Sequence, residues 1–289
     1  MFFSKPITEI IKERTSRRTY SPKPIEKGKE ERLKEIFTLK SFSSPFSNIA
    51  VRCRFELIGM PEFEPNEKKK LGTYGLISGA KEFIVGATEE SKYYIENYGY
   101  LMEVIILAAT DMGLGTCWLG GTFNRSLFSA KINCNSNEIV PAISPIGYNP
   151  ESRSFKEKVI RKIAKANDRY QWDKLFFNNN FNTPLNQEEA GKYAPLLEMV
   201  RLGPSAGNKQ PWRIVKELDN NIYHFYVKSS KNKLGIKYSM FVRLDIGIAI
   251  CHFDLTAREL EVGGNWEFLQ PKINENEGLD YIISWNGSS

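Results

Sequence analysis

The chain has 289 residues, of which 41% are hydrophobic and 26% are charged, a composition typical of a globular protein with one or two domains. Its 40 basic and 34 acidic residues give a net charge of +6, a mild excess that suits a phosphorylated ligand, nucleic acid or neither, and the sequence contains no nucleic-acid reading motif. The longest apolar run, YLMEVIILAAT, is shorter than the roughly 18 residues of a membrane span, and the N-terminus resembles no secretory signal. We therefore expect a cytoplasmic protein that uses neither nucleic acid nor a membrane as its partner.

The N-terminal segment SKPITEIIKERTSRRTY predicts a basic helix. Ser4 is a candidate cap, and Pro6 falls in the first turn, where its missing N–H costs little. Three isoleucines share one helix face with Arg14. Because a buried guanidinium needs an anion, we expect either a carboxylate from elsewhere in the chain or a bound phosphate beside Arg14. The alternative is an exposed basic helix end that complements the helix dipole.

Few residues are suited to metal binding or to His-based catalysis. The four cysteines lie far apart and form no C-x-x-C pair, so neither a disulfide framework nor a zinc site is expected. Of the two histidines, His252 lies in an apolar run, where a hydrogen-bonded structural role is favoured. The sequence therefore nominates no catalytic side chain and no metal ligand.

An internal repeat organises the rest of the chain. Residues 97–118 and 245–266 align without a gap, and the alignment pairs Trp118 with Trp266 and Gly115 with Gly263. Each segment predicts a buried helix that ends in a glycine-rich turn, where glycine tolerates positive φ.

A second pair of segments, 43–58 and 203–218, aligns upstream and matches Asn48 with Asn208. Strand-like runs follow at 138–148 and 279–285. The order helix, Asn loop, strand, buried helix, strand thus occurs twice, which predicts two related halves, 1–165 and 166–289, packed about a pseudo-twofold axis. The alternative is two unrelated α/β domains that both have a glycine turn between a helix and a strand.

Three segments together resemble the FMN-dependent nitroreductase family. The basic motif is Arg14, Ser16, Arg18 and Tyr20; the turn after the first buried helix is Gly113, Leu114, Gly115, Thr116 and Trp118; the loop is Pro204, Ser205, Asn208, Gln210, Pro211 and Trp212. The basic motif is clear only in the first half, and the loop is intact only in the second. The resemblance implies a single-chain pseudo-dimer with a nitroreductase-like α+β fold, in which helices flank a central, mostly antiparallel sheet in each half.

The resemblance also implies one intact FMN site. Arg14, Thr15, Ser16 and Arg18 would bind the phosphate and the pyrimidine edge, and Arg169 is nominated for the phosphate, with Arg161 and Lys165 as competitors. Trp118, Leu119, Gly120 and Gly121 mark the turn that would bring backbone N–H groups to flavin N5. Pro204, Ser205, Ala206 and Asn208 would lie against the ring edge or the ribityl chain. The alternative for this loop is a tight turn in which Asn208 caps backbone groups.

The implied activity is an FMN-dependent oxidoreductase that takes hydride from NADH or NADPH and reduces nitroaromatics, quinones or similar acceptors by ping-pong turnover. A monomer acting as a pseudo-dimer would suffice, and further association stays open. The alternatives are a non-catalytic FMN-binding protein, such as a flavin store or redox sensor, and a scaffold without flavin.

Overall fold

The structure is a computed structural model that describes residues 3–38, 43–49, 53–73, 75–228, 236–273 and 278–288. Its contacts divide the chain into two compact units. The first contains residues 12–166 and the chain up to Lys5, and the second contains residues 6–11 and 167–289. The predicted halves do not include this exchange of residues 6–11.

The first unit is an antiparallel sheet with helices. Its strands are β1 (Arg54–Gly59), β2 (Glu82–Glu89), β3 (Leu114–Thr116), β4 (Glu138–Ile139) and β5 (Ile143–Tyr148). They follow the order β1-β2-β5-β3, and β4 pairs with β2. The helices are α2 (Lys27–Thr38), α3 (Pro65–Lys68), α4 (Tyr94–Asp111), α5 (Arg125–Lys131) and α6 (Phe155–Ile163), with a 3₁₀ turn η1 at Met60–Glu62.

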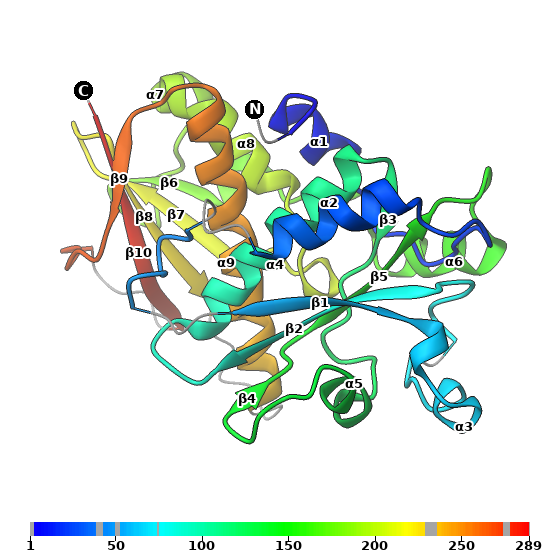
Figure 1. The fold of residues 1–289 in the computed structure, drawn as a ribbon. Helices are drawn as coiled ribbons and strands as arrows, with labels where there is room; N and C mark the ends of the chain where they lie inside the picture. Colours follow the sequence, from blue (N-terminus) through cyan, green and yellow to red (C-terminus); the bar gives the residue numbers. More distant parts are fainter. Residues whose placement is uncertain are drawn as a thin grey trace. The chain divides into compact units, whose positions relative to one another are not determined.

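The second unit repeats this plan. Its strands are β6 (Phe176–Asn178), β7 (Trp212–Lys216), β8 (Ile222–Lys228), β9 (Gly264–Glu267) and β10 (Leu279–Gly287), in the order β6-β7-β8-β10-β9. Among the described strands of this unit, the β6–β7 pair is parallel and the other pairs are antiparallel. The helices are α7 (Gln187–Ala190), α8 (Ala194–Leu202) and α9 (Ile236–Glu259), with 3₁₀ turns η2 (Trp172–Lys174), η3 (Gly191–Tyr193) and η4 (Ala206–Asn208). Helix α9, orange in Figure 1, runs beside this sheet.

The two strand orders correspond element by element, so the predicted α+β fold with two related halves is confirmed. Strands β1, β2, β5 and β3 match β7, β8, β10 and β9 in order and direction. The predicted order lacked β2 and β8. Both are buried along nearly their whole length, so they show no alternation of apolar and polar residues.

Helix α4 is buried in the core of the first unit and helix α9 in the core of the second, because each is apolar on nearly all of its described sides. Each ends in a left-handed residue at the same place in the repeat: Gly113 has φ +76° and Glu261 has φ +53°. The predicted glycine-rich turn therefore holds in the first half. In the second half a glutamate adopts the left-handed conformation that glycine was expected to supply.

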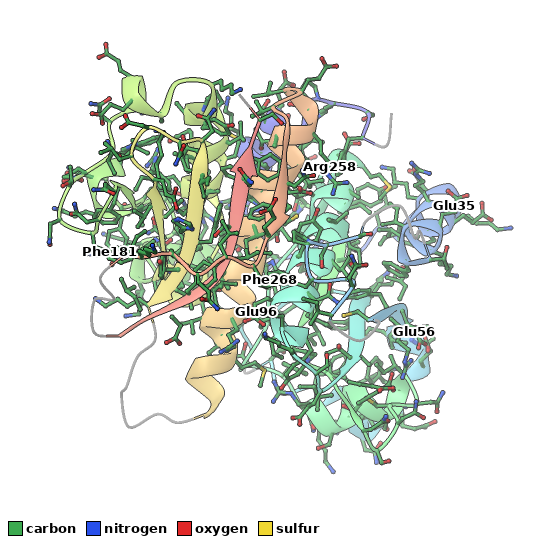
Figure 2. The ribbon with its side chains drawn as sticks, turned by 90° about the vertical axis from the view of Figure 1, so that its left-hand side faces the viewer. Glu35, Glu56, Glu96, Phe181, Arg258 and Phe268 are labelled. Carbon is green, nitrogen blue, oxygen red and sulfur yellow. The ribbon has the colours of Figure 1, made fainter. Side chains whose placement is uncertain are left out.

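Aromatic side chains fill both cores with edge-on contacts. In the second unit, Phe225 and Phe253 pack against Trp266 at centroid distances of 5.1 and 5.6 Å. Phe181, labelled in Figure 2, packs on Tyr226 at 5.0 Å. In the first unit, Phe63, Phe83, Phe123 and Phe128 belong to a single buried cluster.

The N-terminal helix α1 (Ile7–Glu13) is shorter than predicted. It ends before Arg14, so Arg14 does not extend the helical apolar face. Ser4 does not cap it: the amide and hydroxyl of Ser4 both donate to the Asp111 carboxylate at 2.7 Å. Instead, the Glu259 carboxylate accepts from the amides of Ile7 and Thr8 at the helix start.

Candidate functional site

The first unit brings together two of the three family-like segments. Ser16 forms a parallel β-bridge with Thr116, and the Arg17 amide donates to the Thr116 carbonyl at 2.8 Å. The basic motif therefore lies directly on the turn after α4. Farther along, the Tyr20 amide donates to Ser78 at 2.9 Å, which fixes the end of the motif.

Arg14 is buried, with 7% of its surface exposed, and it lies beside a carboxylate. Its Nε atom is 3.9 Å from Oε1 of Glu103 on α4. The other oxygen of Glu103 accepts the indole N–H of Trp118 at 2.7 Å. Burial lowers the pKa of Arg14, and the charge of Glu103 opposes that shift. Of the two anions expected beside Arg14, the structure shows the carboxylate.

A second group of cations surrounds Glu157 on α6. This carboxylate is 1% exposed; its Oε2 accepts the amides of Arg18 and Thr19 at 3.3 and 3.2 Å. Its Oε1 is 3.4 Å from Nε of Arg153, and Nη2 of Arg153 donates to the Thr15 hydroxyl at 2.9 Å.

We call the group of guanidinium groups around Glu157 the arginine cluster; it contains Arg17, Arg18, Arg153 and Arg161. Burial lowers the pKa of Arg153 and of Arg161, and the charges of the neighbouring arginines lower it further. The Glu157 carboxylate lies against Arg153, and the four guanidinium groups together concentrate positive charge in this part of the first unit. Nη1 of Arg18 is buried without a hydrogen-bond acceptor and can donate to an added anion.

Sequence reasoning missed Arg153 and Glu157 because α6 is oriented against its own hydrophobic pattern. Phe155 and Ile163 are 83% and 78% exposed, whereas Glu157 points inward. Apolar periodicity predicts the opposite orientation. The available signal was the density of basic residues in SRSFKEKVIRK combined with the N-cap Ser154, whose hydroxyl accepts the Glu157 amide.

The turn at 119–121 has only part of its backbone available for a ligand. Leu119 exchanges both backbone hydrogen bonds with Ile143, so its N–H is occupied. Within the described residues, the N–H groups of Gly120 and Gly121 have no acceptor. Arg125 braces the turn by donating to the carbonyls of Gly120, Val140 and Pro141 at 2.8 to 3.2 Å.

The loop at 204–208 in the second unit is held by its own polar groups. The Ser205 hydroxyl accepts the Gln210 amide at 2.9 Å, and the Ala206 amide donates to both oxygens of buried Asp245 at 3.0 and 3.1 Å. Positive φ angles occur at Gly207, Asn208 and Gln210, and this conformation is costly for the asparagine and the glutamine. The surrounding bonds therefore fix a strained loop.

Asn208 and Arg169 contact each other in this unit. Asn208 Nδ2 donates to the Asp168 carbonyl at 2.9 Å, as the alternative interpretation of a backbone cap expected. Arg169 donates to Asn208 Oδ1 at 3.4 Å and to the Leu202 carbonyl at 3.1 Å. Arg169 thus supports the loop within its own unit.

The corresponding loop of the first half has a comparable anchor. Asn97 occupies the position in the repeat that Asp245 occupies in the second half. Its side-chain oxygen accepts the Ser44 hydroxyl at 2.5 Å. Asn48 is described, whereas residues 50–52 of this aligned segment lie outside the described residues.

The remaining chemistry-bearing residues have structural surroundings. All four cysteines are free thiols. Nδ1 of His252 lies 2.8 Å from the Met199 carbonyl, in keeping with the favoured structural role. Within the described ranges, no group of three or more His, Cys, Asp or Glu residues could hold a metal ion. Nor does any described helix combine the length and apolarity that crossing a membrane requires.

Comparison with solved structures shows a nitroreductase-like fold. A putative nitroreductase from Thermotoga maritima MSB8 matches 97% of this chain and 93% of its own, with 20% identity and a TM-score of 0.60. An FMN-dependent nitroreductase from Clostridium difficile R20291 matches 53% of this chain and 94% of its own, with 20% identity and a TM-score of 0.40. A nitroreductase with bound FMN from Bacteroides fragilis NCTC 9343 matches 53% and 92%, with 17% identity and a TM-score of 0.40.

The family model described as "Putative TM nitroreductase" matches residues 6–257. The chain therefore belongs to this family. Membership supports a general oxidoreductase role. A comparison with curated proteins gives no match.

Proposed function

We propose that the protein binds FMN and transfers hydride from NADH or NADPH to nitroaromatics, quinones or similar acceptors by ping-pong turnover. The observation that carries the proposal is the pairing of the basic motif with the turn after α4, beside a cluster of four arginines in which Glu157 lies against Arg153. When bound, FMN would supply the hydride-accepting ring, since no described side chain does so. This chain's residues would hold the cofactor and orient it.

The phosphate is assigned to the arginine cluster. Arg18 has a buried donor without an acceptor, and Arg153 lies within hydrogen-bonding distance of Thr15. A dianion near these groups would gain charge-assisted hydrogen bonds and offset the repulsion among the guanidinium groups. Arg14, already beside Glu103, would contribute positive charge near the ring rather than a phosphate contact. Arg169 stays a prediction as a phosphate ligand, with Arg153 as its competitor.

The turn and the loop supply the remaining contacts. Gly120 and Gly121 would direct their unpaired N–H groups at the N5 edge, because glycine lets backbone approach a ring closely. Pro204, Ser205, Ala206 and Asn208 would contribute the second unit's share. The polar side chains of Ser205 and Asn208 already hold the loop, so we assign its contact with the cofactor chiefly to backbone and to the loop's shape.

The first experiment measures cofactor content and turnover. The protein purified with FMN should be yellow, bleach on addition of NADH or NADPH under anaerobic conditions, and regain its colour with a quinone. A yellow protein that neither nucleotide bleaches would leave the non-catalytic FMN-binding function as the conclusion. Failure to retain or bind FMN would contradict both.

Variants test the assignment of residues. Arg18→Ala and Arg153→Ala should each weaken FMN binding by about tenfold or more, since each removes a charge-assisted contact worth about 1.5 to 3 kcal/mol. Arg32→Ala, on α2 of the same unit, removes the same charge and serves as the control. If Arg169→Ala weakens binding while Arg153→Ala does not, the phosphate assignment to the cluster is wrong.

A further inference from the structure

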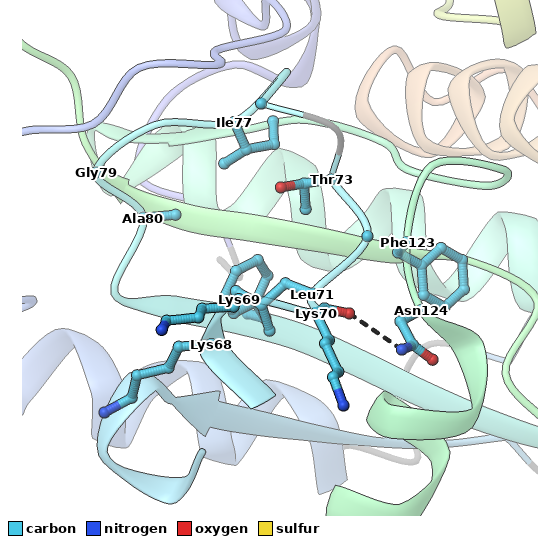
Figure 3. A pocket seen from close by; sticks show the side chains of 13 residues that line it. Lys68, Lys69, Lys70, Leu71, Thr73, Ile77, Gly79, Ala80, Phe123 and Asn124 are labelled. Carbon is cyan, nitrogen blue, oxygen red and sulfur yellow. Dashed lines mark hydrogen bonds between the residues drawn. The ribbon is translucent and has the colours of Figure 1, made fainter. Parts of the chain in front are cut away.

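A cavity of about 680 Å³ opens in the first unit between α3, the loop described at 71–73 and 75–80, and the start of α5. Figure 3 shows it from close by, with Ile77, Thr73 and Ala80 on the loop and Phe123 on the facing segment. The hydrogen bond from Asn124 Nδ2 to the Lys70 carbonyl, at 3.0 Å, closes one side.

Three left-handed glycines shape the loop around this cavity. Gly72, Gly75 and Gly79 have φ values of +75°, +66° and +77°. A Cβ on Gly72 would lie 2.6 Å from the Asn124 amide, and one on Gly79 would lie 2.5 Å from the Tyr20 carbonyl. The loop therefore approaches its neighbours more closely than any other residue type allows, which makes the cavity a preformed feature.

The lining combines apolar walls with positive charge. Phe83 and Phe123 come from the buried cluster of this unit, and Leu71 and Ile77 pack against that cluster. Lys68, Lys69 and Lys70 also line the opening. Among the described lining residues there is no aspartate or glutamate, and none of the three lysines pairs with a carboxylate. Such a lining favours an apolar body that carries negative charge and disfavours a cation.

None of the residues assigned above to FMN lines this cavity. The loop contacts the basic motif through the backbone of Ser78, whose amide donates to the Arg18 carbonyl at 2.8 Å and whose carbonyl accepts the Tyr20 amide at 2.9 Å. We propose that the cavity is a second binding site, separate from the flavin site, for an organic anion with an aromatic body. The inference does not depend on the proposed flavin chemistry, because it concerns binding alone.

A matched pair of dyes tests the proposal. 8-Anilinonaphthalene-1-sulfonate carries an anionic group on an aromatic body, and N-phenyl-1-naphthylamine is its uncharged counterpart. Fluorescence titration of the full chain should give tighter binding of the sulfonate. Lys69→Glu should weaken the sulfonate by about threefold to tenfold and leave the neutral dye nearly unchanged, because only the charge at the rim has been reversed. Thr73→Trp should weaken both dyes by filling the cavity.

The controls decide the outcome. Lys27→Glu makes the same charge change on α2, far from the opening in sequence, and should leave sulfonate binding unchanged. Equal losses in Lys69→Glu and Lys27→Glu would reduce the effect to net charge and overturn the proposal. The proposal would also be overturned if the Thr73→Trp variant bound both dyes as tightly as the native chain does. Displacement of the sulfonate by excess FMN would show one shared site instead of two, whereas additive binding supports the second site.

Discussion

Trp118 donates its indole N–H to the buried carboxylate of Glu103 at 2.7 Å, and the repeat contains a counterpart. Trp266, its partner in the alignment, donates to Asp254 on α9 at 2.8 Å. The helix positions of the two carboxylates differ by three residues within the repeat. Both halves therefore contain a hydrogen bond between an indole and a helix carboxylate, although the carboxylate stands at a different position of the repeat in each.

Removing the indole donors should affect the two halves unequally. Trp118→Phe leaves the fully buried Glu103 short of a hydrogen bond and should cost about 1 to 3 kcal/mol of unfolding free energy. Trp266→Phe should cost less, because Asp254 keeps a close ion pair with the half-exposed Arg258 at 2.8 Å, whereas Arg14 lies 3.9 Å from Glu103. Urea unfolding of both variants measures the difference, and an equal or larger loss in Trp266→Phe would contradict it.

Two glycines with nearly the same backbone conformation should respond differently to alanine. Gly113 and Gly79 have φ of +76° and +77°, but a Cβ on Gly113 meets nothing within 4 Å. Gly113→Ala should cost only the left-handed conformation, about 1 to 2 kcal/mol. Gly79→Ala must also displace Tyr20, so it should lower the thermal midpoint further and weaken FMN binding. Equal midpoints would show that the Tyr20 contact yields without cost.

Glu82 makes stability depend on pH. Partial burial, together with the charge of Glu30, raises the pKa of this carboxyl from 4.5 to about 7. Its contribution to stability is therefore fully present below pH 4.5 and is lost as the pH rises through about 7. Glu82→Gln should stabilise the protein at about pH 8 by about 1 kcal/mol after allowance for solvent screening, with little effect at about pH 4. Thermal midpoints across this range measure it; a constant difference would exclude titration of Glu82 as the cause.

Arg125 provides a test of the glycine turn. Arg125→Lys keeps the charge but cannot bind the carbonyls of Gly120, Val140 and Pro141 together. We expect about 1 to 2 kcal/mol lower stability and slower bleaching of bound flavin by NADH or NADPH, with FMN affinity nearly unchanged. Arg32→Lys on α2 is the control. Bleaching at the native rate would show that the turn does not orient the ring.

The repeat could be predicted from the sequence because the segments of α4 and α9 are apolar on nearly all sides. That pattern, together with the match between Trp118 and Trp266, predicts the order of helix and strand in both halves. Strands β2 and β8 were absent from the prediction because buried strands lack the alternation of apolar and polar residues that marks a half-exposed strand. The end of α1 before Arg14 was also missed, since the spacing that placed Arg14 on the isoleucine face continues past the last helical residue.

Residues of the candidate site could be predicted only where their types and spacing match a family motif. Arg18, Ser16 and the turn at 116–121 could be nominated because their spacing matches the family, and the structure places them side by side. Glu157 could not be found in this way, because an inward carboxylate on a helix with an exposed apolar face contradicts amphipathic periodicity. The roles of Asp245 and Arg125 depend on contacts across long sequence separations, which spacing does not encode.

The assignment of residues 6–11 to the second unit has a consequence for how the duplicated chain can be divided. Cutting at 166 would yield a C-terminal fragment without Ile7, Ile10 and Ile11, and would leave Glu259 without the amides that it accepts. The C-terminal piece would therefore be incomplete as a separately produced protein. Because residues 6–11 come from the opposite end of the chain, a single cut cannot release the second unit with all of its parts.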